Sequence, residues 1–316
     1  MQHKLILFTG AGPGVGKSTL SAFLAQQFTA HALPTRWIYE EDTLDAFTPF
    51  FQALREKQLN TLDLFLDAAR NLVLDCQAQS SVCIVDSLLP GYGFFFGAHP
   101  LTAIAALTNQ LVTILAPLHP LLVYVDGDVA VALNRAITQR GSAWFERMVQ
   151  RMNSWNLPLY PDKPFSNQQS VIAFDQQARQ FALRLLDHWY EPKLMLNTND
   201  TPLDQLKAQL LGYFQLDERS IHTGVDPERL ASYCGIYAAR DGATTESAVE
   251  IRYVDGQLVI NRYWPNGTVL VAEAHDQFRL ENTNYRVIFE QQTNGIIKGL
   301  TLFYRDQQHQ LAKVDC

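Results

Sequence analysis

The stretch Gly10-Ala11-Gly12-Pro13-Gly14-Val15-Gly16-Lys17-Ser18-Thr19 decides how the first part of this chain folds. An apolar run at residues 5–8 precedes it and an amphipathic run at residues 20–28 follows it, so the order is strand, glycine-rich loop and helix. The spacing fits the phosphate-binding pattern G-x-x-x-x-G-K-[ST], with Ala11 in the first glycine position. A small residue at that position still allows a sharp turn, so the sequence predicts a loop that binds a triphosphate.

Each residue type in the loop has a physical role in holding phosphates. Glycines let successive backbone N–H groups turn inward, and together with the start of the next helix these groups form an electropositive nest. Lys17 is expected to reach the β- and γ-phosphates of ATP, and the Ser18 hydroxyl to bind Mg²⁺. A dinucleotide-binding G-x-G-x-x-G pattern does not fit, because Lys17 would stand among its glycines. The predicted nucleotide-binding residues are Gly12, Pro13, Gly14, Val15, Gly16, Lys17, Ser18 and Thr19.

Length and composition narrow the class of protein. The chain has 316 residues, of which 47% are hydrophobic, and this favours two domains with substantial cores. The net charge of -7 disfavours nucleic acid as a partner. The four cysteines lack metal-site spacing, which favours reduced thiols. No apolar run approaches the ~20 residues that span a bilayer. The N-terminal apolar run leads directly into the glycine loop, so we expect a cytoplasmic protein with no membrane partner.

Apolar strands alternate with helical patterns over residues 1–216. This alternation predicts a three-layer α/β/α domain of the P-loop NTPase class, built on a five-stranded parallel sheet. We expect Asp128 to cap a helix that runs to Arg140 and stops at Gly141, and the polar segment 142–164 to interrupt the helical periodicity. The predicted strands are residues 5–8, 35–39, 82–86, 121–125 and 193–197. The other predicted helices are residues 20–28, 44–57, 61–79, 101–115, 168–190 and 201–214, the last with Thr201 as its N-cap.

The pattern changes in the last third of the chain. Residues 217–227 are polar and are predicted to form a linker. Residues 228–316 show short alternating runs separated by turn signals, which predicts a small antiparallel β domain. Its predicted strands are residues 249–253, 258–260, 268–272, 278–280, 285–289 and 296–304.

Carboxylates follow two of the strands predicted for the first domain. Asp86 ends the apolar run 82–85, and a carboxylate beside the phosphate-loop strand is placed to hold Mg²⁺. A strand-ending turn gives the same residue type, but the four apolar residues before Asp86 favour the metal-binding interpretation. The acidic cluster Glu40, Glu41 and Asp42 ends the second strand and faces the ligand crevice. A carboxylate there would take the proton of an attacking hydroxyl or help to hold the metal, and Glu40 or Glu41 is the predicted one. A solvated acidic loop explains them equally well.

Arginines and aromatic residues complete the set of candidates. Arg140 precedes Gly141, where a mobile lid would begin, and arginines near a lid stabilise a transferring phosphoryl group. At least two of the four arginines in this region are expected on solvated helix faces, the four being Arg135, Arg140, Arg147 and Arg151. The aromatic loop at residues 92–96 either lines a pocket for the acceptor or packs in the core.

Four segments of the first domain resemble the nucleoside and nucleotide kinases of the thymidylate kinase-like group: AGPGVGKST, VCIVDS, LVYVDGDVAVALNRAITQRG and KLMLNTNDTPLDQL. This resemblance covers about two thirds of the chain. It implies that Arg140 is the lid arginine and that Asn199 lies near the adenine base. The chain departs from the group where Asp86-Ser87 replaces an Asp-Arg pair. Few arginines precede the lid to hold an acceptor phosphate, namely Arg36, Arg55 and Arg70.

The C-terminal segments LASYCGIY, DQFRL, YRVIFE and GIIKGLTLFY resemble the small β domain appended to bacterial enzymes of the serine β-lactamase and peptidase type. That resemblance implies no chemistry for the domain.

Taken together, these patterns predict an ATP-binding, Mg²⁺-dependent phosphotransferase that moves the γ-phosphoryl group of ATP to a hydroxyl of a small molecule without a phosphate. Lys17, Glu40 or Glu41, and Arg140 are its predicted catalytic residues, and Ser18 and Asp86 its metal ligands. The alternative is a nucleotide-hydrolysing switch or regulatory NTPase whose β domain binds a partner. The sequence leaves the oligomeric state open, a homodimer included.

Overall fold

A computed structural model describes residues 2–40, 45–56, 58, 60–87, 89–154, 157, 165–219, 226–239, 248–261, 267–304 and 307–314. The chain divides into two compact units. The first comprises Met1–Thr138 and Ser142–Arg219, and the second comprises Gln139–Gly141 and Ser220–Cys316.

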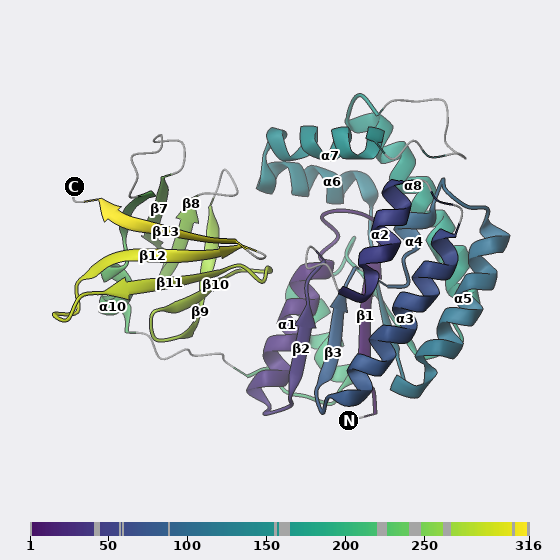
Figure 1. Ribbon diagram of the computed structural model, residues 1–316, viewed down its shortest axis with the longest axis horizontal. Helices are drawn as coiled ribbons and strands as arrows, with labels where there is room; N and C mark the ends of the chain where they lie inside the picture. Colours follow the sequence, from purple (N-terminus) through teal and green to yellow (C-terminus); the bar gives the residue numbers. More distant parts are fainter. Residues whose placement is uncertain are drawn as a thin grey trace. The chain divides into compact units, whose positions relative to one another are not determined.

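The first unit is built on a five-stranded parallel sheet in the order β2-β3-β1-β4-β5, as Figure 1 shows in part. The central strands are covered on both faces, which explains why they are continuous apolar runs. Each strand pairs in parallel with its neighbour, and Phe8 of β1 lies opposite Asp86 of β3. The expected five-stranded parallel sheet of a P-loop α/β fold is therefore confirmed. The strands are β1 (Leu5–Gly10), β2 (Thr35–Ile38), β3 (Val82–Asp86), β4 (Leu121–Asp126) and β5 (Lys193–Asn197).

Helices cover both faces of the sheet. Side chains alternate along a strand, so Leu5 and Leu7 of β1 join one buried cluster with α3 and α5, whereas Ile6 and Phe8 join a second cluster with α1 and α9. The helices are α1 (Lys17–Ala30), α2 (Thr48–Arg55), α3 (Thr61–Ala78), α4 (Tyr92–Phe95), α5 (Leu101–Leu115), α6 (Val129–Arg140), α7 (Ser142–Ser154), α8 (Gln168–Leu185) and α9 (Leu203–Tyr213). Short 3-10 turns are η1 (Asp45–Phe47), η2 (Ala116–Leu118) and η3 (Leu186–His188).

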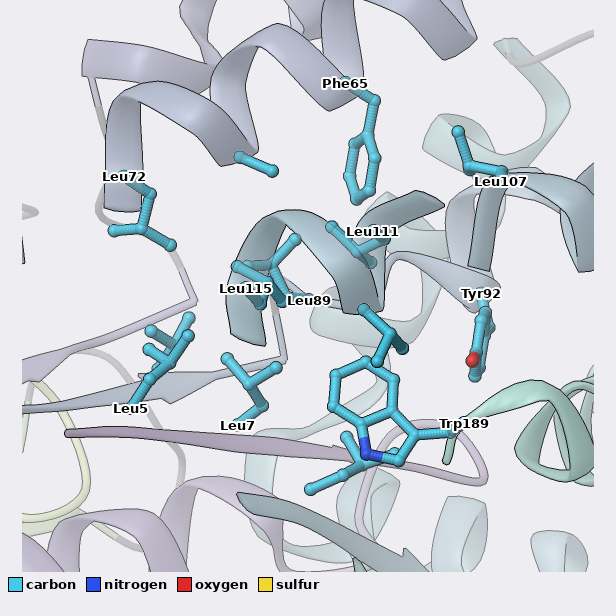
Figure 2. Packing of buried hydrophobic residues seen from close by; sticks show 14 of the residues in the cluster. Leu5, Leu7, Phe65, Leu72, Leu89, Tyr92, Leu107, Leu111, Leu115 and Trp189 are labelled. Carbon is cyan, nitrogen blue, oxygen red and sulfur yellow. The ribbon is translucent and has the colours of Figure 1, made fainter. Parts of the chain in front are cut away.

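The segment Leu101–Leu118 has a mean hydropathy of 1.6 and is long and apolar enough to cross a membrane by length and composition. The expectation that no run approaches this length is therefore wrong. In the structure, Leu107, Leu111 and Leu115 of this segment are buried in the same cluster as Phe65 of α3 (Figure 2). Its apolar face is that of a helix packed in the core of the first unit.

Helix α8 passes from one layer of the first unit to the other. Val171 and Phe174 in its first half are buried in the cluster that contains α1 and α6. Ala182 and Leu185 in its second half are buried in the cluster that contains α3 and α5. The middle turns of α8 therefore lie where the two layers meet.

Several helix boundaries differ from those expected. The segment predicted to interrupt the periodicity contains helix α7, whose buried residues Met148 and Met152 are spaced four apart among polar residues. Helix α8 ends five residues earlier than predicted and continues as η3. Helix α9 is capped by Pro202 rather than Thr201, and without a side-chain hydrogen bond. The Asp128 cap is confirmed, because its carboxylate accepts a hydrogen bond from the Val131 amide at 2.9 Å.

The second unit is a closed antiparallel barrel of eight strands, preceded by helix α10 (Pro227–Ser232). Large aromatic side chains, among them Tyr233, Tyr237, Phe278 and Phe289, fill its interior. The strands are β6 (Gly235–Ala239), β7 (Val249–Val254), β8 (Gln257–Asn261), β9 (Thr268–Ala274), β10 (Gln277–Leu280), β11 (Arg286–Gln291), β12 (Ile297–Tyr304) and β13 (Gln307–Val314).

The separate antiparallel β domain is thus confirmed, although two of its strands were not predicted. Strand β13 is mostly polar, and Leu311 is its one buried residue among those described. It pairs with β6 and β12 and so completes the barrel. The resemblance to the β domain of serine hydrolases remains a prediction.

Candidate functional site

The glycine loop joins β1 to α1 and is packed tightly against α6. Gly12, Gly14 and Gly16 have positive φ angles, which side chains disfavour. At Gly14 a Cβ would lie 2.1 Å from the Ala132 carbonyl oxygen of α6, so only glycine fits. The guanidinium of Arg135, one turn further along α6, donates a hydrogen bond to the Gly14 carbonyl at 3.0 Å. Contacts from helix α6 at Gly14 therefore hold the loop in place.

Lys17 lies across the loop. Its Nζ donates a hydrogen bond to the Gly12 carbonyl oxygen at 2.7 Å. Its positive charge also acts on the carboxyls of Asp86 and Asp175, because it partly offsets the rise in pKa that burial causes in each. The lysine thus interacts with acidic groups of two different elements, β3 and α8.

Asp86 is fully buried at the end of β3, beside the phosphate-loop strand. Burial and the nearby charge of Glu40 raise its pKa to about 7, while Ser18, Lys17 and Ser87 act in the opposite direction. Its Oδ1 accepts a hydrogen bond from the Ser87 hydroxyl at 3.0 Å. Its Oδ2 has no hydrogen-bond partner among the residues that the structure describes. The structure therefore brings Lys17, Ser18 and Asp86 together.

Glu40 follows β2 and is exposed. Its charge raises the pKa of Asp86, so its carboxylate interacts with the end of β3. Glu41, the other predicted proton acceptor, lies outside the described residues.

Asn199 follows strand β5. Its Oδ1 accepts a hydrogen bond from the Asp128 amide. A Cβ at the adjacent Gly127 would lie 2.4 Å from Thr198 Oγ1 and 3.6 Å from Val15 Cγ1. The segments after β4 and β5 thus converge beside Val15 of the glycine loop.

Arg140 is the last residue of α6 and precedes Gly141, whose φ of 84° ends the helix. Five residues separate it from Arg135, which corresponds to about 500° of helical rotation, so the two side chains project about 140° apart. The arginine of α6 that contacts the glycine loop is therefore Arg135, and the lid role of Arg140 stays a prediction.

Asp175 is a site residue that the sequence analysis missed. It lies on α8, and a Cβ at Gly12 would be 3.3 Å from its Oδ2. Burial raises its pKa to about 7, and Lys17 partly offsets that rise. The sequence held a signal, because Asp175 stands in the helical stripe of Val171 and Ala178, where the periodicity calls for an apolar residue.

The aromatic loop after β3 packs in the core over most of its length. Tyr92 and Phe95 are buried in the cluster with α3 and α5. Phe96 instead packs against Phe174 of α8, with ring centroids 5.0 Å apart. Core packing thus explains Tyr92 and Phe95, and Phe96 packs against the buried cluster that contains Phe174.

These features define the class of the first unit, which is a P-loop α/β fold. No protein-family model and no curated protein matches the chain. Among solved structures, the chain is similar to a deoxyadenosine kinase from M. mycoides with bound dATP, at 13% sequence identity and a TM-score of 0.39. The match covers 67% of this chain and 100% of that one.

Proposed function

We propose that the chain is an ATP- and Mg²⁺-dependent phosphotransferase that moves the γ-phosphoryl group of ATP to a hydroxyl of a small molecule without a phosphate. The observation that supports it is the convergence of Lys17, Ser18 and Asp86 at the ends of adjacent strands. The charge of Lys17 and a hydrogen bond from Ser18 both oppose the rise in the pKa of Asp86, which supports this grouping. Phosphoryl transfer depends chiefly on such positioning and charge stabilisation.

The chain's own residues suit ATP. The positive φ angles of the loop glycines expose backbone N–H groups, and Lys17 supplies a cation that is held on a loop carbonyl. The convergence of Gly127, Asn199 and Val15 suits the base. Arg140 is proposed to stabilise the transferred group from the end of α6.

The donor set also fits Mg²⁺. The buried Oδ2 of Asp86 lacks a hydrogen-bond partner among the described residues, and a hydroxyl and a carboxylate are oxygen ligands of the kind that Mg²⁺ prefers. Among the described residues no cluster of three or more His, Cys, Asp or Glu is present, and Mg²⁺ in such sites is held by one or two protein groups plus phosphates. When bound, the ion neutralises charge on the β- and γ-phosphates.

The supply of arginines favours an acceptor without a phosphate. Arg36 and Arg70, two of the three arginines before residue 120, pair with Asp75 and Asp67 respectively. These ion pairs occupy cations that an acceptor phosphate would need.

A regulatory NTPase is the second candidate. The second unit has a closed barrel and a core of its own, which suits a partner-binding module. In that case nucleotide hydrolysis would control what the barrel binds.

ATP turnover distinguishes the two candidates. The purified full chain is assayed with Mg²⁺ and ATP, alone and with a panel of nucleosides and other hydroxyl compounds. We expect acceptor-stimulated ADP release with a phosphorylated product, and a loss of about 100-fold or more in Lys17→Ala. Lys298→Ala, in the barrel, is the matched control and should be unaffected. ADP release that no compound stimulates would contradict the transferase and favour the regulatory NTPase.

A further inference from the structure

The position of Asp175 is fixed by contacts on both sides of it along α8. Phe174 packs against Phe96 and Phe165, with centroids 5.0 and 5.1 Å apart. One turn after Asp175, the Arg179 guanidinium donates two hydrogen bonds to the Asp126 carboxylate at the end of β4, each at 2.6 Å. These contacts hold the carboxyl of Asp175 over the loop at Gly12.

Asp175 is partly exposed, but its Oδ2 is buried and incompletely bonded. Its Oδ2 has no hydrogen-bond partner within the described part of the chain. A buried polar group without a partner destabilises the folded state, so a fold that keeps one has a use for it elsewhere. Burial also raises the pKa of Asp175 to about 7, where a carboxyl exchanges protons efficiently at neutral pH. This combination is typical of a functional acid–base group.

Asp175 lies against the donor loop, and the residue before it on α8 contacts the aromatic segment after β3. Next to it are Gly12 and Lys17, at the end of the loop where the lysine would meet the γ-phosphate. Phe96 of the aromatic segment packs against Phe174, the residue that precedes Asp175 on α8. A hydroxyl that attacks the γ-phosphorus from this side of the loop would meet the carboxyl of Asp175.

Resting on the proposed function, we propose that Asp175 is a catalytic residue that accepts the proton of the acceptor hydroxyl. The hydroxyl O–H bond breaks and its proton moves to Oδ2 of Asp175, while the oxygen forms the new bond to the γ-phosphorus. The bond from that phosphorus to the β,γ-bridging oxygen breaks, and its electron pair leaves with ADP. Asp175 then releases the proton to water.

The charged groups around Asp175 suit this role. Lys17 of α1 is the cation that faces it, and it favours the ionised carboxylate needed at the start. Arg179 and Asp126, one turn away, neutralise each other in their ion pair. Glu40, which the sequence suggested as the proton acceptor, is exposed, and its charge acts on Asp86 at the end of β3.

The test compares Asp175→Asn with Asp187→Asn in the full chain. Asn has the same shape as Asp but takes no proton, and Asp187 is an exposed aspartate of η3 that serves as the matched control. Water is the first acceptor probe, through basal ATP hydrolysis, followed by the most effective compound of the hydroxyl panel. Affinities for ATP and ADP are measured separately with Mg²⁺ at pH 8, because these do not depend on turnover.

We expect Asp175→Asn to lower turnover about 100-fold with either acceptor, in the range typical of a lost general base. Removal of a negative charge beside the γ-phosphate should tighten ATP binding about three- to tenfold and leave ADP binding unchanged. Asp187→Asn should change none of these values. Asp175→Glu, which keeps a carboxyl, should recover part of the lost turnover.

Each contrary result has a definite meaning. Turnover in Asp175→Asn within threefold of the parent would overturn the proton-accepting role. Equal changes in ATP and ADP affinity would overturn the placement of Asp175 at the γ-phosphate. If the parent chain binds ATP but shows no turnover with water or with any compound of the panel, the proposed function fails and the proton-accepting role fails with it. The comparison of ATP and ADP affinities still decides whether Asp175 lies at the γ-phosphate.

Discussion

The carboxyl of Asp175, whose Oδ2 is buried, leads to a quantitative prediction about stability and pH. Its pKa is 3.8 when exposed and about 7 in the folded protein. The folded state therefore binds this proton more tightly than the unfolded state. Its contribution to stability is fully present below pH 3.8 and is lost as the pH rises through 7.

The size of the effect follows from the two pKa values. One pKa unit corresponds to about 1.4 kcal/mol. Between pH 5 and pH 8, the ionisation of Asp175 should lower the free energy of unfolding by about 2.5 kcal/mol. Asp175→Asn removes this contribution to the pH dependence of the unfolding free energy. Any change in stability caused by the asparagine itself is the same at both pH values and cancels in the comparison.

The assay is urea unfolding at pH 5 and pH 8, followed by tryptophan fluorescence. Trp189 is buried in the first unit and reports on its unfolding. For each protein, the unfolding free energy at pH 8 is subtracted from that at pH 5. This difference should be smaller by about 2.5 kcal/mol in Asp175→Asn than in the parent, and Asp187→Asn should match the parent. If the parent and Asp175→Asn respond to pH in parallel, the carboxyl is ionised and solvated in the folded protein, and the reasoning is wrong.

Two further substitutions test the contacts that shape the site. Gly14→Ala should destabilise the first unit by about 2–4 kcal/mol and abolish ATP binding, because its Cβ would lie 2.1 Å from the Ala132 carbonyl at a positive φ. Gly212→Ala, within a helix and with open space around it, should instead stabilise by up to about 1 kcal/mol, and equal thermal midpoints for the two variants would contradict this reasoning. Arg179→Gln should cost about 1–3 kcal/mol, because it leaves the largely buried Asp126 without its bidentate partner. An unchanged urea midpoint would show that this pair contributes nothing.

Local signals were sufficient for most of the first unit. The strand, glycine loop and helix at its start follow from residue types at fixed spacing, and the apolar runs predicted five parallel strands because both faces of such a sheet are covered. Asp86 could be assigned to a strand end beside the loop because strand order in this class places it there. These local signals were enough to predict that Ser18 and Asp86 lie close together.

Local signals failed where long-range packing decides the outcome. Helix α7 was missed because only Met148 and Met152 are buried in a polar segment. Strand β13 was missed because most of its residues are polar and it becomes a strand by pairing with β6 and β12. Barrel closure is a property of such pairing and leaves little trace in the composition of one strand.

The sequence by itself determined that this chain has a phosphate-binding loop with Lys17 and Ser18, a carboxylate on the neighbouring strand and a separate β unit. Only the tertiary structure decided which residues of distant helices meet that loop. Arg135 reaches Gly14 and Asp175 reaches Gly12 because long-range packing brings α6 and α8 against the loop. The environment of a carboxyl, and hence its pKa, depends on what surrounds it in space, and that information is not carried by its neighbours in the chain.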